Sequence, residues 1–315
     1  MSGNVELRAV FVKALGEYME KDERIVVIDA DLARATGTLP LREQFPDRAI
    51  DVGVAEANMV SVAAGLESYG FLPFCTTFSP FLARRACDQA ALSVAYAKRN
   101  VKLVGTDPGI TAELNGGTHC GLEDISIMRS LVDMVVFEPV DAIQLEQAMP
   151  QIMAYEGPMY IRLARKPQAE VFDGSYKFGL FTADVLQEGA DVTIFATGIM
   201  VKESLKAASL LAADGISAEV VNVHTIKPLD HDTILASAKK TGCAVTAENH
   251  STIGGLYSAV CELLCAEYPL PVTAIGIDNM FGEVGFIPYL QERFKMRACD
   301  IAAACKASIE KKGRA

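Results

Sequence analysis

Polar residues that could perform acid–base chemistry or bind an anion gather in three parts of the sequence. In the first, residues 51–59, Glu56 falls in the first turn of an expected helix of small residues. A glutamate at that position can offset the helix dipole, and it can also act as a buried acid–base group. Periodicity alone leaves both roles open.

The second part is the glycine-rich stretch 106–121, which contains His119, one of four histidines in the chain. A loop of this length inside a compact domain commonly binds a ligand. The third part carries Arg162, Arg165 and Lys166 at the carboxyl end of an expected strand. Ligands of α/β sheets commonly lie at that edge, although the same cations could instead form a solvated surface.

Short β-branched segments alternate with segments of helical period, which predicts α/β domains whose parallel or mixed sheets are covered by helices. The first series predicts strands at 25–29, 72–78, 101–105, 134–137 and 159–162, with helices at 5–20, 56–69, 81–98, 122–131 and 142–155. A second series predicts strands at 192–196, 218–223, 244–247 and 272–275, with helices at 201–213, 255–267 and from residue 300 onward.

The two series are separated by a stretch rich in proline, glycine and charge, which is typical of a connection between domains. We therefore predict two α/β sandwich domains, residues 1–168 and 191–315, joined by a linker over residues 169–190. A length of 315 residues fits two domains of ordinary size.

The sequence contains neither of the usual glycine-rich phosphate-binding motifs, G-x-G-x-x-G and G-x-x-x-x-G-K-[ST]. Glycine turns at 197–199 and 254–255 could each bind an anion at a helix N-terminus, or could simply satisfy the geometry of a turn.

The composition argues against several classes of protein. The chain has 40 acidic and 29 basic residues, and the net charge of −11 argues against a nucleic-acid partner. No stretch approaches the roughly 18 apolar residues of a membrane-spanning helix, and residues 1–6 do not resemble a secretory signal. We therefore expect a cytoplasmic protein that binds no membrane. The eight cysteines include no C-x-x-C pair, which favours reduced thiols and predicts no metal site on this chain.

An ordered series of motifs resembles the pyrimidine-binding domain of transketolases: Gly-Val-Ala-Glu at 53–56, the aromatic run at 74–81, Gly-Gly-Thr-His at 116–119 and the segment 128–141. Motifs at 196–198, 225–230 and 248–255 are similar to the C-terminal domain of the same superfamily, so the resemblance covers essentially the whole chain. The sequence lacks the Gly-Asp-Gly motif of the diphosphate-binding domain. The chain therefore resembles the C-terminal half of a split transketolase.

The resemblance implies thiamine diphosphate as cofactor, with Mg²⁺ or Ca²⁺ bound mainly by a partner subunit. Glu56 matches the catalytic carboxylate that exchanges a proton with the pyrimidine ring of the cofactor. Phe78 and Phe81 match the aromatic walls of the pyrimidine site. His119 matches a histidine that takes part in catalysis and contacts the substrate, and Arg165 matches an arginine that binds the sugar phosphate.

Two loop positions depart from the usual transketolase pattern. Asp107 replaces a histidine and Asn115 replaces an aspartate, and both positions match substrate-binding residues. Asp107 and the run 81–84 are instead similar to deoxyxylulose-phosphate synthase. Because a carboxamide is a neutral donor and acceptor where a carboxylate is a charged acceptor, the identity of the ketose and the aldose stays open.

The resemblance further implies ketol transfer between sugar phosphates, as in the pentose phosphate reactions, and activity only with an N-terminal partner subunit. The active site of this family lies between subunits, which implies a heterotetramer in which two copies of this chain form a dimer through the small residues 57–65. Three alternatives stay open: the β subunit of a 2-oxo acid dehydrogenase decarboxylase component, a deoxyxylulose-phosphate-synthase-like enzyme, and a non-catalytic regulatory or scaffold subunit.

Overall fold

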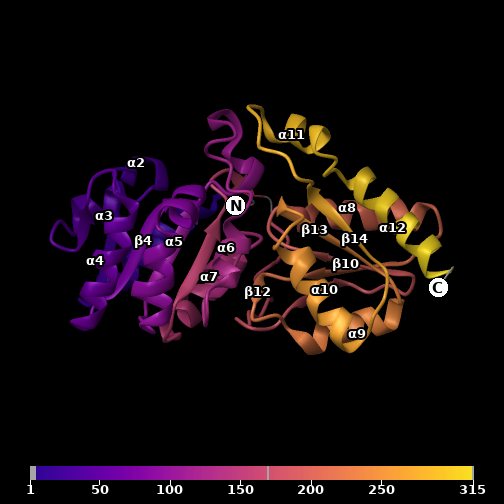
Figure 1. The fold of residues 1–315 in the computed structure, drawn as a ribbon, viewed down its shortest axis with the longest axis horizontal. Helices are drawn as coiled ribbons and strands as arrows, with labels where there is room; N and C mark the ends of the chain where they lie inside the picture. Colours follow the sequence, from indigo (N-terminus) through magenta and orange to yellow (C-terminus); the bar gives the residue numbers. More distant parts are fainter. Residues whose placement is uncertain (1–4, 169, 314–315) are drawn as a thin grey trace.

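Two α/β units lie side by side in the computed structural model, which describes residues 5–168 and 170–313 (Figure 1). Each unit has one sheet between layers of helices, so the expected α/β class is confirmed. No described helix has the length and apolar character needed to span a bilayer.

The first sheet has seven strands in the order β12-β6-β7-β5-β4-β2-β3. Its strands are β2 (Ile25–Asp29), β3 (Ala49–Asp51), β4 (Leu72–Phe78), β5 (Lys102–Thr106), β6 (Val135–Phe137), β7 (Met159–Leu163) and β12 (Thr225–Lys227). All pairs are parallel except that of β12, which comes from the second unit and runs antiparallel to β6. The central strands are buried on both faces, which is why their sequences are almost continuously apolar.

Helices cover both faces of this sheet. The two helices α1 (Leu7–Met19) and α7 (Ala142–Ala154) pack on one face, and α4 (Glu56–Ser68) and α6 (Asp124–Ser130) pack on the other. Short helices α2 (Ala33–Thr36) and α3 (Leu39–Gln44) connect β2 to β3. Successive residues of each strand point to opposite faces, so one strand contributes to both apolar clusters.

The helix expected over residues 81–98 is divided into three segments. Two wide π-helical segments, η1 (Phe81–Arg85) and η2 (Ala90–Tyr96), flank the short α5 (Cys87–Gln89). Helical periodicity alone does not distinguish a π-turn from an α-turn, so the sequence predicted one continuous helix. Wide turns of this kind recur at functional sites.

The second sheet has five strands in the order β14-β13-β10-β11-β9. Its strands are β9 (Asp184–Gln187), β10 (Val192–Ala196), β11 (Ala218–Asn222), β13 (Ala244–Ser251) and β14 (Val272–Ile277). Helices α8 (Met200–Ala213) and α12 (Ala298–Lys312) pack on one face, α9 (His231–Thr241) and α10 (Leu256–Glu267) pack on the other, and α11 (Ile287–Arg293) lies above the sheet (Figure 1).

The stretch 169–190, predicted as a linker, contains the antiparallel edge strand β9. Its Asp184 carboxylate accepts hydrogen bonds from Tyr176 Oη at 3.0 Å and from Asn222 Nδ2 at 3.1 Å. This edge strand has only four residues, and its two apolar residues are flanked by Asp184 and Gln187, so it is too short to stand out in the sequence. Just before this stretch, β8 (Pro167–Gln168) pairs with β1 (Val5–Glu6), so the first helix begins at Leu7 rather than at Val5. Residue 169 lies outside the described residues.

Candidate active site

The predicted site residues follow four strands that end at the same edge of the first sheet. Glu56 follows β3, Phe78 ends β4, Asp107 follows β5 and Arg165 follows β7. Within the sheet, Phe78 is in register with Thr106 of β5. The carboxyl edge of a parallel sheet is where α/β proteins commonly bind ligands. Sheet topology therefore brings these distant positions to one edge.

Glu56 is the first residue of α4, and its side chain is only 4% exposed. Arg85 Nη1 donates a hydrogen bond to Glu56 Oε1 at 2.7 Å, and Arg85 is the only side-chain donor to this carboxylate among the described residues. The second oxygen is left for another donor. The turn before Glu56 is fixed because Asp51 Oδ1 accepts from the backbone N–H of Gly53 at 2.8 Å.

Asp51 belongs to a small ionic network at the ends of β2 and β3. Arg42 contacts the carboxylates of both Asp29, at 2.6 Å, and Asp51, at 3.0 Å. Burial raises the pKa of Asp29, although Arg42 opposes this effect. The network joins α3 to the turn that leads into Glu56, and it therefore limits movement of that turn.

Three aromatic rings lie together beside Glu56. The ring centroids of Phe78 and Phe81 are 5.6 Å apart, and that of His119 lies 5.9 Å from Phe78 and 5.1 Å from Phe81. The Arg85 guanidinium carbon lies 3.9 Å from the centroid of Phe81, which joins the rings to Glu56. The structure thus brings Glu56, Phe78, Phe81 and His119 into one cluster.

Sequence reasoning missed Arg85. Its position four residues after Phe81, on one helical segment, is the signal that could have found it.

A second group forms where β5 and β7 end. Asp107 is buried, has a positive φ of 55° and forms an ion pair with Arg165, whose Nη1 lies 3.1 Å from Asp107 Oδ2. Burial raises the pKa of Asp107, with Arg165 acting in the opposite direction. The other oxygen, Oδ1, is buried and has no hydrogen-bond partner among the described residues.

Other residues of this region make contacts of their own. Lys166 Nζ lies 2.8 Å from Glu113 Oε2, and Asn115 ends the short 3₁₀-helix η3 (Gly109–Asn115) with an exposed side chain. Thr118 Oγ1 and His119 Nδ1 are 2.8 Å apart. Within the described part of the chain, no hydrogen bond or ion pair joins Asp107, Arg165 or Asn115 directly to the Glu56 cluster.

Arg162 was predicted to bind a ligand or to lie in solvent, and both expectations are wrong. Its side chain is fully buried between the two units. Arg162 Nε lies 2.8 Å from Asp124 Oδ2 and Nη1 lies 2.6 Å from Glu138 Oε1, so two buried carboxylates balance its charge. This cation holds the interface between the units together and does not face the site. A strand position alone could not reveal this, because the carboxylates come from distant segments.

The glycine turns proposed to bind anions instead approach carboxylates of the protein. Glu248 Oε2 accepts from Leu256 N at 2.7 Å, and Oε1 accepts from Tyr257 N at 2.9 Å, so an internal carboxylate caps α10. A Cβ on Gly255 would lie 2.0 Å from Glu248 Oε2, and one on Gly198 would lie 2.4 Å from Glu138 Oε1. Both glycines therefore allow close packing, which favours the turn-geometry alternative over anion sites.

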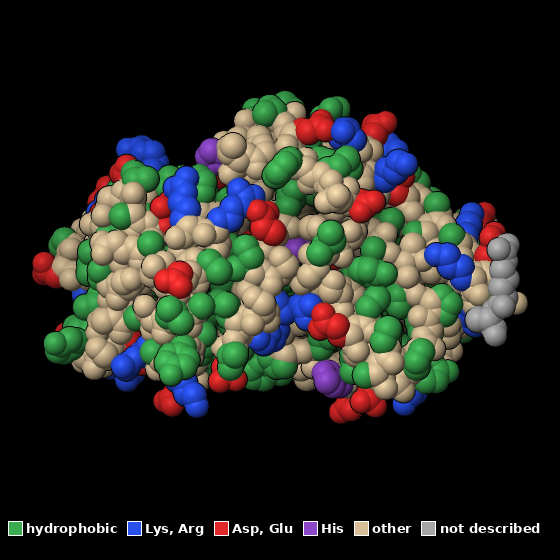
Figure 2. Space-filling model, viewed as in Figure 1, with side chains coloured by type: hydrophobic (Ala, Val, Ile, Leu, Met, Phe, Trp, Pro, Cys, Tyr) green, Lys and Arg blue, Asp and Glu red, His purple; other side chains and the backbone are tan. Residues whose placement is uncertain are grey.

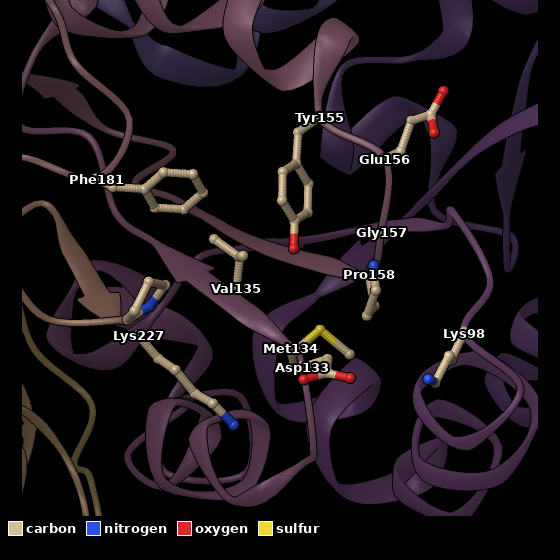
Figure 3. Close-up of a pocket in the computed structure, with 11 residues that line it drawn as sticks. Lys98, Asp133, Met134, Val135, Tyr155, Glu156, Gly157, Pro158, Phe181 and Lys227 are labelled. Atoms are coloured by element: carbon tan, nitrogen blue, oxygen red, sulfur yellow. The ribbon is translucent and has the colours of Figure 1, made fainter.

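A cavity of about 450 Å³ lies at the opposite edge of the first sheet, near the beginnings of β6 and β7 (Figure 3). Tyr155, Phe181 and Lys227 line it together with acidic side chains. Among the described residues that line this cavity, none is a predicted site residue. The candidate active site lies instead at the carboxyl edge of the sheet.

Comparisons with known proteins agree with this fold. Residues 4–168 match the family described as transketolase, pyrimidine binding domain, and residues 182–301 match transketolase, C-terminal domain. The chain belongs to the transketolase family.

More particular relatives are single subunits of similar length. The chain is 55% identical to the 6-deoxy-6-sulfo-D-fructose transketolase subunit SqwH of Clostridium sp. (strain MSTE9), covering 97% of this chain and 95% of that protein. It is 37% identical to a putative transketolase C-terminal section of Methanocaldococcus jannaschii, covering 97% and 96%. A solved structure described as "Split gene transketolase, inactive beta4 tetramer" is 42% identical, with a TM-score of 0.89, and covers 98% of this chain and all of that one.

The deoxyxylulose-phosphate synthase alternative has weaker support. The 1-deoxy-D-xylulose-5-phosphate synthase 1 of Geobacter sulfurreducens is 36% identical, and the match covers 99% of this chain but 49% of that enzyme. These synthases are therefore more distant relatives than the split transketolase subunit.

Proposed function

We propose that this chain is the C-terminal subunit of a split transketolase that transfers a two-carbon ketol unit from a ketose to an aldose. The observation that carries the proposal is the buried Glu56 carboxylate, which has one oxygen without a side-chain partner among the described residues and lies beside the aromatic cluster. In the reaction, the C2–C3 bond of the ketose breaks, the shortened aldose leaves, and the two-carbon unit forms a new bond to the carbonyl carbon of the acceptor.

The residues present fit the pyrimidine end of thiamine diphosphate, the cofactor that family membership implies. A carboxylate at the edge of an apolar aromatic surface offers both a hydrogen-bond acceptor and a face for stacking, which a flat heteroaromatic ring requires. When bound, this cofactor supplies the electron sink that allows the bond next to a carbonyl to break.

The chain's own residues have distinct proposed roles. Glu56 exchanges a proton with the ring nitrogen that faces it, because a buried carboxylate can both accept and return that proton. Phe78 and Phe81 hold the ring by stacking and exclude water. His119, which lies against Phe81, donates a hydrogen bond to the substrate oxygen where negative charge develops.

We propose that Asp107, Asn115 and Arg165 bind the substrate. The Arg165 guanidinium offers a planar pair of N–H donors, which suits the oxygens of a phosphate or a sulfonate. The 55% identity to a sulfofructose transketolase subunit supports 6-deoxy-6-sulfo-D-fructose as donor. The neutral Asn115 carboxamide can both donate to and accept from a sugar hydroxyl of such a substrate.

We further propose an N-terminal partner subunit that binds the diphosphate and its Mg²⁺ or Ca²⁺, in a cytoplasmic heterotetramer with two copies of each chain. The similar beta4 tetramer is described as inactive, which supports a requirement for a partner. Exposed apolar side chains beside the site, Leu114, Phe281, Val284 and Phe286, give such a partner a surface to cover. Figure 2 shows apolar side chains gathered at the top, over the projection that η3 and α11 form in Figure 1.

The test is to assay the chain alone and mixed with the purified product of the neighbouring gene, with thiamine diphosphate and Mg²⁺. The panel contains 6-deoxy-6-sulfo-D-fructose, fructose 6-phosphate and unmodified fructose as donors, and the released aldose is measured. Activity in the mixture only, with the sulfonated donor preferred, supports the proposal. Decarboxylation of 2-oxo acids without ketol transfer would favour a dehydrogenase β subunit, and an inactive mixture would favour the non-catalytic alternative.

A further inference from the structure

The loop that carries the substrate-binding residues, here called the site loop (residues 107–121), is held by one side chain of the other unit. Asn249 lies in β13 and is fully buried. The backbone N–H of Ile110 donates to Asn249 Oδ1 at 2.8 Å, and Asn249 Nδ2 donates to the carbonyl of Pro108 at 3.1 Å. One carboxamide therefore satisfies a donor and an acceptor on either side of Gly109.

The fit at this point leaves no room for a larger residue. Gly109 has a positive φ of 55°, and a Cβ there would lie 2.2 Å from Asn249 Oδ1. Only glycine combines that conformation with this close approach. The contact therefore requires both the glycine at position 109 and the carboxamide of Asn249.

The C-terminal end of the site loop is also held close to Asn249. The N–H of Gly109 donates to the carbonyl of Gly121 at 2.9 Å, which closes the base of the loop. Arg162 Nη2 donates to the Asn249 carbonyl at 2.7 Å and to the Gly121 carbonyl at 3.2 Å. Both ends of the loop therefore depend on the position of β13.

Removing the carboxamide would leave the buried Ile110 N–H without its partner, and the Pro108 carbonyl would keep only the hydrogen bonds that Thr111 donates to it. Unsatisfied buried backbone groups are unfavourable, so the loop would move to reach water or other donors. Asp107 and His119 lie at the two ends of this segment, and both would move with it. The aromatic walls and Glu56 lie on β4, η1 and α4, outside the loop.

We propose that Asn249 is a positioning residue for the active site: it sets the geometry of Asp107, Asn115 and His119 without touching the substrate. The C-terminal unit then serves the reaction by holding a loop of the pyrimidine-binding unit in place. The kinetic part of this inference rests on the proposed function, whereas the structural part does not.

The structural test is hydrogen–deuterium exchange on the chain alone, comparing the natural protein with Asn249→Ala and Asn222→Ala. Asn222 is the matched control, because it is also a buried asparagine that bonds across the two units, to Gln144 at 3.5 Å, but it lies away from the site loop. We expect exchange at residues 109–121 to accelerate at least tenfold in Asn249→Ala only, with β10 and β13 as protected as before. Unchanged loop exchange, or equal acceleration in both variants, would overturn the inference.

The kinetic test uses the assembled complex with its partner subunit. For Asn249→Ala we expect kcat/KM for the ketose to fall at least tenfold, through a higher KM because Asp107 and Asn115 move and through a lower kcat because His119 moves, while the affinity for thiamine diphosphate changes less than about twofold. Asn249→Asp keeps the hydrogen-bond acceptor and loses the donor, so its kcat/KM should lie between those of the natural protein and Asn249→Ala. If Asn249→Ala does not fold, Asn249→Asp takes its place in the test. Natural kinetics in both variants, or an equal loss of cofactor affinity, would refute the positioning role. If the unmutated complex transfers no ketol unit, the proposed function fails while the exchange result still decides the loop contact.

Discussion

The Arg85 guanidinium stacks on the Phe81 ring and donates a hydrogen bond to Glu56 Oε1 at 2.7 Å. Two elements that are distant in sequence, η1 and α4, are joined by this contact. The arginine occupies one carboxylate oxygen and leaves the other without a side-chain donor among the described residues. The orientation of the proposed proton-transfer group is therefore set by its neighbour as well as by its own helix.

Replacing Glu56 should remove proton exchange while keeping the shape of the site. In the assembled complex we expect Glu56→Gln to lower kcat by about 100-fold or more, because positioned acid–base groups contribute about 10²- to 10⁴-fold. Initial rates of ketol transfer measure this. Glu67→Gln is the matched control, since Glu67 lies on the same helix and pairs with an arginine, Arg99, away from the site. An active Glu56→Gln complex would rule out the catalytic role.

Removing Arg85 should have a smaller effect. Its side chain is 49% exposed, so the ion pair with Glu56 contributes about 1 kcal/mol or less. We expect Arg85→Ala to lower kcat/KM about fivefold, because the Glu56 carboxylate loses the neighbour that fixes its orientation. Arg84→Ala, which breaks an exposed pair with Glu123, is the control and should leave kcat/KM nearly unchanged. Equal values of kcat/KM for the two variants would contradict the positioning role of Arg85.

Arg165 should discriminate between anionic and neutral sugars. We expect Arg165→Ala to raise KM for sulfonated and phosphorylated ketoses about tenfold or more, because a charge-assisted hydrogen bond is lost. The KM for an unmodified ketose should stay within about twofold. Lys166→Ala gives the comparison, since it removes the adjacent cation, which pairs with Glu113 rather than with Asp107. An equal increase in KM for charged and neutral sugars would show that Arg165 does not recognise the anionic group.

Lowering the pH should destabilise the interface between the two units, because His250 becomes protonated on unfolding. Burial lowers the pKa of His250 from 6.5 to about 4. Between these values the unfolded chain binds more protons than the folded one, so this group makes the free energy of unfolding fall as pH falls. Burial also raises the pKa of Glu248 from 4.5 to about 7, which acts in the opposite direction, so the comparison must be with a variant.

Denaturant unfolding of the natural chain and His250→Asn at several pH values separates the two effects. We expect the natural chain to lose more stability than the variant between pH 6.5 and pH 4. His231→Asn, at the exposed start of α9, is the control and should follow the natural chain. Parallel curves for the natural chain and His250→Asn would contradict the expected titration.

Sequence patterns were informative where a local period or an ordered motif carried the signal. The strand that ends at Phe78 and the helix that begins at Glu56 lie at the predicted positions. A buried parallel strand and a helix of small residues both have clear sequence patterns. The family motifs predicted that Glu56, Phe78, Phe81 and His119 belong to one site. The spacing of these residues along the sequence did not predict any contact between them.

The residues that were missed or misjudged depend on contacts between distant segments. Arg162 has the same sequence context as a ligand-binding cation, but two carboxylates from other elements bury it. Asn249 contacts the site loop from 139 positions away along the chain, measured to Ile110. No local period encodes such pairs, so they become visible only when the two units are placed together.

The antiparallel strand β12 has a consequence for any attempt to divide the protein. This strand comes from the second unit, yet it supplies the last hydrogen-bonded neighbour of β6 in the first. A fragment ending at residue 168 would expose the backbone of β6 as an open sheet edge, which favours aggregation by strand addition. A truncated first unit is therefore a poor starting point for binding studies.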